Sequence, residues 1–366
     1  MMSLLSSDTW ESQLMIDLHM HSFFSEDGEM KPEELIRKCA ALGMSMMSIT
    51  DHNCVKANET AMRAAHALGI AYIPGTEIDC MYKGTGFHVL GYGIDYRSSD
   101  YEKIERDVRE QGLRASLERL EKTQLLGFHV TEDEMWQKSK DTYWEESWTG
   151  DLFAEVILAK PEYAGHPLLR PYREGGGRSD NPYVNFYWDF YSQGKLCYVE
   201  MSYPPMEEVI RIIHGSGGKA VLAHPGVSLK GKETFLEGIL DLGIDGIEAF
   251  SSYHNPAECF HYYHEAKRRG LFVTCGSDYH GKTKPSVFLG KNGCMLSDEE
   301  IAGQMPFFDI AKSQGKSMMT IRRTVASRMA HQTSDYNLIA SIPGHSAEVD
   351  RLHISTISPA PRKRRN

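Results

Sequence analysis

The stretch Asp17-Leu18-His19-Met20-His21, followed by a further carboxylate at Asp27, is the sequence around which the chain is organised. Residues 15–18 predict a short buried strand, with the two histidines at its end and just beyond it. Side chains at positions i and i+2 of an extended chain point the same way, so two imidazoles can converge on one ion. Asp27 follows a turn and can return an oxygen ligand to the same place. A lone histidine pair is equally compatible with a solvated or core role, so its meaning depends on matching ligands elsewhere.

Length and composition narrow the possible classes of protein. A chain of 366 residues suits an α/β barrel with an insertion, or two domains. The formal net charge of −10 argues against a general binder of nucleic acid or anionic membranes, but not against an anionic substrate, because bound divalent metals dominate their local field. The cysteines are scattered and odd in number, no signal peptide is recognisable, and no apolar run reaches the ~18 residues of a membrane span. We therefore expect a cytoplasmic protein with reduced thiols and no membrane partner.

Short apolar runs alternate with amphipathic segments in two separate parts of the chain, 15–96 and 206–296. The predicted strands are residues 15–18, 45–50, 70–75, 87–92, 219–223, 246–250 and 271–276. The predicted helices between them are residues 32–43, 56–68, 205–215, 232–242 and 256–269. This alternation predicts right-handed βαβ units and a largely parallel sheet, and hence an α/β fold.

The alternation is interrupted between these two parts and fades after them. Residues 99–126 predict one long charged helix, and residues 130–204 are aromatic and irregular, with four of the five tryptophans. We interpret 97–205 as an inserted helical, aromatic-rich cap subdomain. The tail, 297–366, is expected to be poorly ordered. Its basic run at 361–365 can contact nucleic acid, although such chain ends are more often disordered.

Polar residues recur directly after the predicted strands. In a closed α/β barrel these strand ends share one face, where active sites of such barrels lie. The set combines imidazole and carboxylate without cysteine, which suits Zn²⁺, Mn²⁺ or Fe²⁺. It is too large for one ion and sufficient for two or three. Its members are His19 and His21, Asp51 and His52, Glu77, His224, and Asp278 and His280.

Four of these segments resemble the motifs of the polymerase and histidinol phosphatase (PHP) family of metal-dependent phosphoesterases. They are residues 17–21, Thr50-Asp51-His52, Ala223-His224-Pro225-Gly226 and Gly276-Ser277-Asp278-Tyr279-His280, and the resemblance covers roughly 15–95 and 205–290. The family fold implied is a distorted (β/α)7 barrel. The resemblance implies two to three divalent ions, Mn²⁺ before Fe²⁺ or Zn²⁺, with Glu77 as the bridging carboxylate. The implied ligands are His19, His21, Asp27, His52, Glu77, His88, His224, Asp278 and His280.

The resemblance also implies a mechanism, direct in-line attack on phosphorus by a metal-bridging hydroxide without a phospho-enzyme. Asp51 is a candidate to orient a ligand histidine, or has only a strand-end role. His254 is a candidate proton donor or phosphate ligand, or else a surface histidine in a turn. Five arginines are candidates to contact the substrate phosphates, or else are solvated surface residues. These are Arg114, Arg119, Arg170, Arg173 and Arg178.

Within the family, the insertion resembles that of small phosphatases acting on nucleoside 3′,5′-bisphosphates, although residues 148–198 depart from the usual compact cap. The leading hypothesis is therefore monoester hydrolysis of such a bisphosphate. The alternatives are a cyclic phosphate phosphodiesterase acting on a phosphorylated ribose, an oligonucleotide exonuclease, a histidinol phosphatase and a metal-stabilised scaffold. The expected partner is a small phosphorylated substrate rather than a stable nucleic-acid partner, and the oligomeric state is left open. The aromatic insertion is cap core, or a surface that stacks on a purine.

Overall fold

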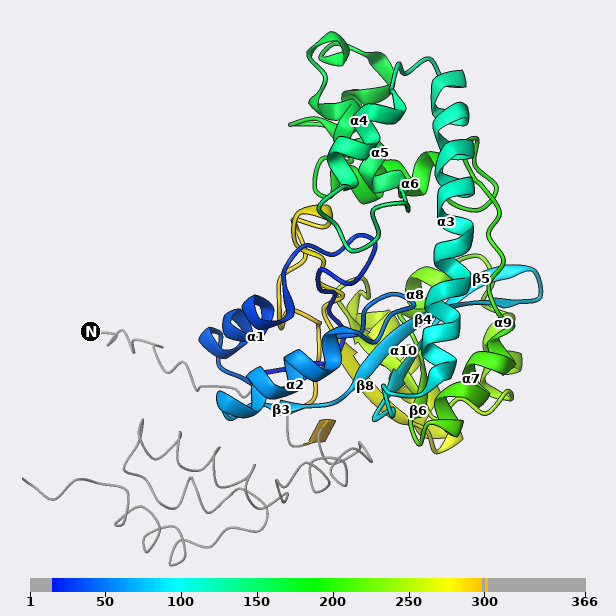
Figure 1. The fold of residues 1–366 in the computed structure, drawn as a ribbon. Helices are drawn as coiled ribbons and strands as arrows, with labels where there is room; N and C mark the ends of the chain where they lie inside the picture. The colour runs from blue at the N-terminus through cyan, green and yellow to red at the C-terminus, as the bar shows by residue number, and fades with distance from the viewer. Residues whose placement is uncertain (1–14, 298–299, 302–366) are drawn as a thin grey trace, which may run out of the picture. The chain divides into compact units, whose positions relative to one another are not determined.

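The computed structural model describes residues 15–297 and 300–301, so nearly all of the predicted tail lies outside the described residues. Its strands form two sheets, in the orders β1-β2-β3 and β4-β5-β6-β7-β8 (Figure 1). The first sheet is parallel and consists of β1 (Met15–Asp17), β2 (Met44–Met47) and β3 (Ala71–Tyr72). The second consists of β4 (Gly75–Tyr82), β5 (Thr85–Tyr92), β6 (Lys219–Leu222), β7 (Gly246–Ser251) and β8 (Phe272–Gly276).

The second sheet is mixed, because β4 and β5 form an antiparallel hairpin that the sequence analysis did not predict. The two-residue turn between them is Lys83-Gly84, with φ values of 48° and 74°. A turn with positive φ at both central residues reverses the chain with the twist that adjacent strands require. β5 then pairs antiparallel with β6, whereas β6, β7 and β8 are parallel. The parallel βαβ pattern therefore holds only outside the hairpin.

Backbone hydrogen bonds join the two sheets at both edges. Next to β8, Leu18 N donates to Cys275 O at 3.0 Å and His21 N donates to Tyr279 O at 2.8 Å. Next to β4, Glu77 N donates to Asp51 O at 3.1 Å. The residues that follow β1 and β2 are thereby held beside β8 and β4, and the fold is a mixed α/β fold.

The helices that cover these sheets begin and end close to the predicted positions. α10 covers the predicted residues, with a capping box between Asn255 and Glu258 at its start and Gly270 in the left-handed conformation after its end. The predicted helix at 232–242 is shorter, and a separate turn precedes it. The helices are α1 (Pro32–Ala41), α2 (Ala57–Ala67), α7 (Met206–Gly215), α8 (Pro225–Ser228), α9 (Phe235–Leu240) and α10 (Pro256–Arg269), with the 3₁₀ turn η3 (Gly281–Thr283).

Between β5 and α7 the chain forms a helical segment, residues 97–205, that rises beside the sheets (Figure 1). Most of its rings pack into a core of their own, which includes Trp148, Phe153 and Phe186. Trp144 joins the segment to the sheet-bearing part, because its Nε1–H donates to Phe24 O at 2.7 Å. The helices are α3 (Ser99–Leu125), α4 (Glu132–Ser139), α5 (Gly150–Ala159) and α6 (Pro182–Phe190), with the 3₁₀ helices η1 (Pro161–Tyr163) and η2 (Pro167–Tyr172).

Candidate metal centre

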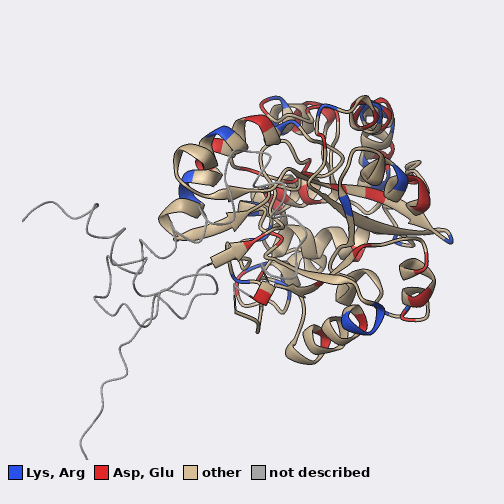
Figure 2. Ribbon diagram, turned by 90° about the horizontal axis from the view of Figure 1, so that it is seen from below, with Lys and Arg blue, Asp and Glu red and all other residues tan. Residues whose placement is uncertain are grey.

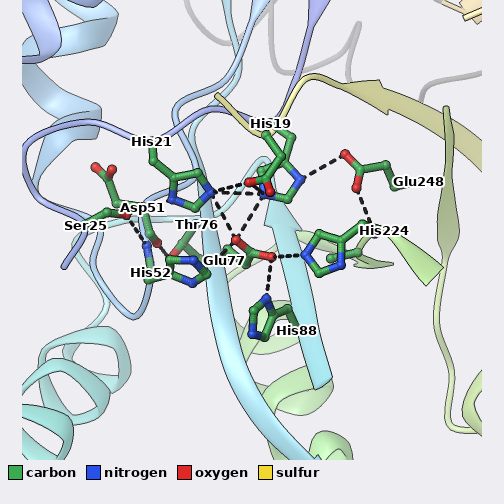
Figure 3. Close-up of polar contacts among 12 residues, drawn as sticks. His19, His21, Ser25, Asp51, His52, Thr76, Glu77, His88, His224 and Glu248 are labelled. Carbon is green, nitrogen blue, oxygen red and sulfur yellow. Dashed lines mark hydrogen bonds and ion pairs between the residues drawn. The ribbon is translucent and has the colours of Figure 1, made fainter. Parts of the chain in front are cut away.

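Four donor atoms from three strands or strand ends meet at the centre of the site (Figure 3). His19 Nε2 lies 3.2 Å from His21 Nε2, 3.0 Å from Glu77 Oε2 and 3.2 Å from Asp278 Oδ1. His21 Nε2 lies 3.2 Å from Glu77 Oε2 and 3.0 Å from Asp278 Oδ1. Ligands of a tetrahedral ion with bonds of about 2.0–2.2 Å are separated by roughly 3.3 Å, so these atoms have the spacing of one coordination sphere.

Glu77 connects this group to two further histidines. Its Oε2 faces His19 and His21, whereas its Oε1 lies 2.9 Å from His88 Nδ1 and 3.0 Å from His224 Nε2. A carboxylate whose two oxygens face different histidine pairs has the arrangement of a bridging ligand. The two pairs come from different sheets. His19 and His21 follow β1 of the first sheet, whereas His88 lies on β5 and His224 follows β6 of the second.

A further group shares His21 with the four-atom group. Its members are His21, Asp27, His52 and His280, whose donor atoms lie within 4.8 Å of one another. His280 Nε2 lies 3.1 Å from Asp27 Oδ2, and the His21 and His280 rings stack with centroids 3.8 Å apart. Asp27 therefore returns to the site after its turn, as its place after the histidine pair predicts. All nine residues of the predicted ligand set are brought together.

The bonding of these groups fits divalent ions. Buried polar atoms normally have hydrogen-bond partners. Here four buried atoms make no well-aligned hydrogen bond, although Asp278 Oδ1 lies 3.0 Å from His21 Nε2 and His280 Nε2 lies 3.1 Å from Asp27 Oδ2. They belong to residues of the groups above and are Asp27 Oδ1, His52 Nδ1, Asp278 Oδ1 and His280 Nε2. Unpaired lone pairs that converge from imidazoles and carboxylates are the donor set that Mn²⁺, Fe²⁺ and Zn²⁺ accept. The site can therefore hold more than one ion.

Local backbone geometry positions several of these side chains. His224 and Asp278 directly follow strands and have φ values of 26° and 57°, which non-glycine residues rarely adopt. Strain of this kind persists only where the surroundings impose it, and it is common at functional sites. Glu77 differs from the prediction, because it lies inside β4 rather than after a strand, whereas His88 lies inside β5, as the predicted strand 87–92 places it. The hairpin brings them to the same place by a different route.

A buried carboxylate that the sequence analysis missed supports the site from behind. Glu248 on β7 is fully buried, and its Oε1 lies 2.9 Å from His19 Nδ1. Its Oε2 accepts a hydrogen bond from His224 N at 2.8 Å. Because Glu248 accepts a hydrogen bond from the Nδ1–H of His19, the Nε2 of that ring is left to act as a ligand. A glutamate inside the apolar run of residues 246–250 was the available signal.

Other supporting groups hold the remaining ligands. Ser25 Oγ lies 2.8 Å from His21 Nδ1, and Lys284 Nζ donates to Asp278 Oδ2 at 2.7 Å. Asp79 Oδ1 lies 3.1 Å from His88 Nε2, and Asn53 Nδ2 donates to the other Asp79 oxygen. Asp79 shares a strand face with Glu77, two residues earlier, and this spacing was a usable signal. Nothing in the pattern around Lys284 indicated its role.

The charges of the site depend on one another. Burial disfavours protonation of His19 and His21, but the surrounding carboxylates outweigh it, so the pKa of His19 lies well above its ordinary value and the pKa of His21 rises to about 9. For His52, burial prevails and lowers the pKa to about 4. Burial also opposes the charge of Glu77, yet the neighbouring histidines hold the pKa of that carboxyl well below its usual range. Metal ions would replace protons here, so binding should release protons.

The two residues predicted to assist catalysis, Asp51 as an orienting group and His254 as a proton donor or phosphate ligand, have structural contacts. Asp51 accepts hydrogen bonds from Ser22 N at 2.6 Å and from Ser22 Oγ at 2.7 Å, which fixes the loop after His21. His254 lies behind the turn that follows His224: Gly226 N donates to its Nε2 at 2.9 Å, and its Nδ1 lies 3.0 Å from Ala249 O. With both ring nitrogens used by the backbone, His254 holds this turn in place.

The five arginines predicted to bind phosphate contact the helical segment itself. Arg119 donates to Trp148 O, and Arg173 donates to Leu158 O and Tyr163 O. Arg178 pairs with Asp189 at 2.8 Å. Arg114 is exposed and lies 3.8 Å from Glu118, while Arg170 lines a separate cavity beside Arg173. Their role in substrate binding stays a prediction without support from these contacts.

Comparison with known proteins agrees with this geometry. The PHP domain family profile matches residues 17–214, more than half of the chain. The chain is 28% identical over 276 residues to the 3′,5′-nucleoside bisphosphate phosphatase of Chromobacterium violaceum, covering 72% of this chain and 87% of that protein. It is 28% identical to the 5′-3′ exoribonuclease Rnm of Salmonella typhimurium, covering 76% of this chain and 89% of that protein.

Two further similarities lie in the same range. The chain is 26% identical to the phosphoribosyl 1,2-cyclic phosphate 1,2-diphosphodiesterase of Eggerthella lenta, covering 73% of this chain and 94% of that protein. A crystal structure assigned to the metal-dependent phosphoesterases, from Bifidobacterium adolescentis, superposes with a TM-score of 0.63 at 26% identity, covering 79% of this chain and 94% of that one. The chain belongs to the PHP domain family and is a metal-dependent phosphoesterase.

Proposed function

We propose that the chain hydrolyses a phosphate monoester of a nucleoside 3′,5′-bisphosphate. The observation that carries the proposal is the Glu77 carboxylate, whose two oxygens face separate histidine pairs in a fully buried setting. Such an arrangement suits two or more adjacent divalent ions, with Mn²⁺ the ion we expect first. When bound, these ions supply activation of water and neutralise the oxygens of the reacting phosphate.

The chain's own residues prepare the site for that chemistry. Glu248 and Ser25 fix the ring orientations of His19 and His21, and Lys284 holds the outer oxygen of Asp278. These supports leave the inner donor atoms aimed at one place, as phosphoryl transfer requires positioning and charge stabilisation above all. The bonds between the residues after β1 and those after β8 support a closed, distorted barrel, with 97–205 as an inserted cap.

The choice of substrate rests on the relatives and on the charge distribution. A nucleoside bisphosphate phosphatase and an exoribonuclease are equally similar to the chain. Binding of long RNA is favoured by a continuous basic surface on the protein. Figure 2 shows acidic and basic residues interspersed along the described helices, in a chain with a net charge of −10. Among the described helices, none combines the length and apolarity needed to cross a membrane.

Phosphate release by the Mn²⁺-loaded protein tests the proposal. The substrates would be adenosine 3′,5′-bisphosphate, ribose cyclic phosphates, a 5′-phosphorylated oligoribonucleotide and histidinol phosphate. We expect the bisphosphate to give the highest kcat/KM. Preferred turnover of the oligonucleotide or of a cyclic phosphate would contradict the proposal and identify the corresponding relative as the better guide.

A further inference from the structure

A cavity of about 310 Å³ opens directly beside the candidate metal centre. Its wall includes Asp79, His88 and His224, so one end of the cavity is formed by residues of the centre itself. Small-molecule sites have volumes of roughly 300–1,000 Å³, so the space suits a nucleotide-sized ligand. The rest of the wall comes from the β4–β5 hairpin, the helical segment, α8 and the loop between α8 and α9.

Four aromatic residues of the helical segment line this cavity, Tyr187, Trp188, Tyr198 and Tyr203. Trp188, Tyr198 and Tyr203 are not part of the core around Trp148, Phe153 and Phe186, whereas Tyr187 packs against it. Trp188 remains 45% exposed although its neighbour Phe186 in the same helix is fully buried. Burial, together with the carboxylates of Asp151 and Asp79, raises the pKa of the Tyr187 hydroxyl, which stays protonated and able to donate. Rings held in this way offer flat faces for a nucleobase.

Two lysines line the same cavity, Lys230 and Lys232, in the loop between α8 and α9. Within the described part of the chain, neither side chain has an ion-pair or hydrogen-bond partner. By contrast, Lys219 and Lys284 are paired with carboxylates. Two unpaired lysines on the wall of one cavity in an acidic protein attract an anion, and lysine binds phosphate as a point charge.

We propose that this cavity is the specificity subsite of the enzyme. This inference rests on the proposed function above. Lys230 and Lys232 bind the phosphate that is not cleaved, and the four rings contact the base, while the reacting phosphate lies at the centre. The ligand class is therefore a nucleotide with two separate phosphate groups. The subsite supplies cations for the substrate, a role that the contacts of the arginines in the helical segment do not support.

The test compares a substrate that carries the second phosphate with one that lacks it. kcat and KM are measured for adenosine 3′,5′-bisphosphate and for p-nitrophenyl phosphate, using metal-loaded wild type and Lys230→Ala/Lys232→Ala. We expect the ratio of the two kcat/KM values to fall at least tenfold in the variant, chiefly through KM for the bisphosphate. The charge-preserving Lys230→Arg/Lys232→Arg should recover part of it. A control with the same loss of charge, Lys56→Ala/Lys195→Ala, changes exposed lysines outside the cavity and should keep the wild-type ratio. An unchanged ratio in the first variant would overturn the subsite.

Direct binding separates failure of the subsite from failure of the proposed function. Titration calorimetry with adenosine 5′-monophosphate and adenosine 3′-monophosphate needs no turnover. If the wild type does not hydrolyse the bisphosphate, the proposed function fails. The subsite then stands if the alanine variant binds at least one monophosphate ten times more weakly than wild type, and falls if both proteins bind alike. Trp188→Ala should weaken the same titration at least fivefold, whereas an unchanged affinity would remove this ring from the subsite.

Discussion

The candidate metal centre and the helical segment 97–205 treat polar groups in opposite ways. At the centre, His19, His21 and Glu77 are fully buried, and several neighbouring donor atoms have no hydrogen-bond partner. In the helical segment, Arg173 and Arg178 are partly exposed and bond to carbonyls and to a carboxylate of that segment. Its own buried atoms without a partner belong to none of the converging groups; they are Asp151 Oδ1, His166 Nδ1 and Arg173 Nε. Burial without satisfied bonds is costly, and it is retained where a ligand completes the bonding. Charged residue types alone therefore do not identify a binding site, whereas unsatisfied and converging ones do.

The largest effect is expected at the four-atom group. His19→Ala removes a ligand that faces Glu77 and Asp278 and should lower kcat/KM by about 10³-fold or more, because bound metal supplies several kcal/mol of transition-state stabilisation. Elemental analysis should show fewer bound ions per chain, and chelation should abolish wild-type turnover. His66→Ala, an exposed histidine on α2, is the matched control. Full metal content and turnover in His19→Ala would place the centre elsewhere.

A smaller effect is expected one layer behind the ligands. Glu248→Gln keeps the shape of the side chain but replaces one of its two oxygens by an NH2 group. The hydrogen bonds from His19 Nδ1 and His224 N go to different oxygens, so one of them loses its acceptor. Metal affinity, measured by competition with a chelator, should fall about 10- to 100-fold. The exposed Glu121→Gln should leave it unchanged. If Glu248→Gln binds metal like the wild type, Glu248 only packs.

His254 distinguishes a structural from a catalytic histidine. Burial lowers its pKa, so below about 6.5 the unfolded chain binds a proton that the folded chain does not, and stability decreases as the pH falls. In His254→Gln this dependence should weaken, and loss of the Gly226 bond should cost about 1–3 kcal/mol at pH 7.5. Urea unfolding at pH 7.5 and 5.5 measures both effects. If the stability of His254→Gln instead depends on pH as that of the wild type does, and one limb is lost from the pH profile of kcat, His254 has a catalytic role.

The sequence predicted the metal centre far better than the substrate site, for a physical reason. His19, His52, His224 and Asp278 follow apolar runs that form strands, and a short strand fixes where its end residues lie. Helices bounded by proline or capping residues, such as α10, were also predictable. The β4–β5 hairpin was missed because its Lys83-Gly84 turn lies inside what read as one connection. A glutamate inside an apolar run signalled that Glu248 was unusual, but the local pattern does not show that it contacts His19, which follows a distant strand.

The phosphate-binding role of the arginines in the helical segment stays a prediction, because a residue type does not reveal its partner. Arg178 shows this most clearly, since its guanidinium contacts both oxygens of Asp189 and also donates to Asn185 O. The partners lie 7 and 11 residues away, on the next helix. Lys230 and Lys232 had no motif of their own and emerge only because the fold places them beside the centre.

The smallest effect is therefore expected for Arg178→Ala. Arg178 and Asp189 are 39% and 38% exposed, and a pair of this kind contributes about 0–1 kcal/mol after screening by solvent. We expect a loss of stability of that size in urea unfolding and a change of less than twofold in KM for adenosine 3′,5′-bisphosphate. Asp189→Asn should give a similar stability change, because it weakens the same pair from the other side. A tenfold rise in KM for Arg178→Ala but not for Asp189→Asn would mean that the guanidinium leaves Asp189 to bind phosphate. In that case the helical segment would still contribute a cation to the substrate.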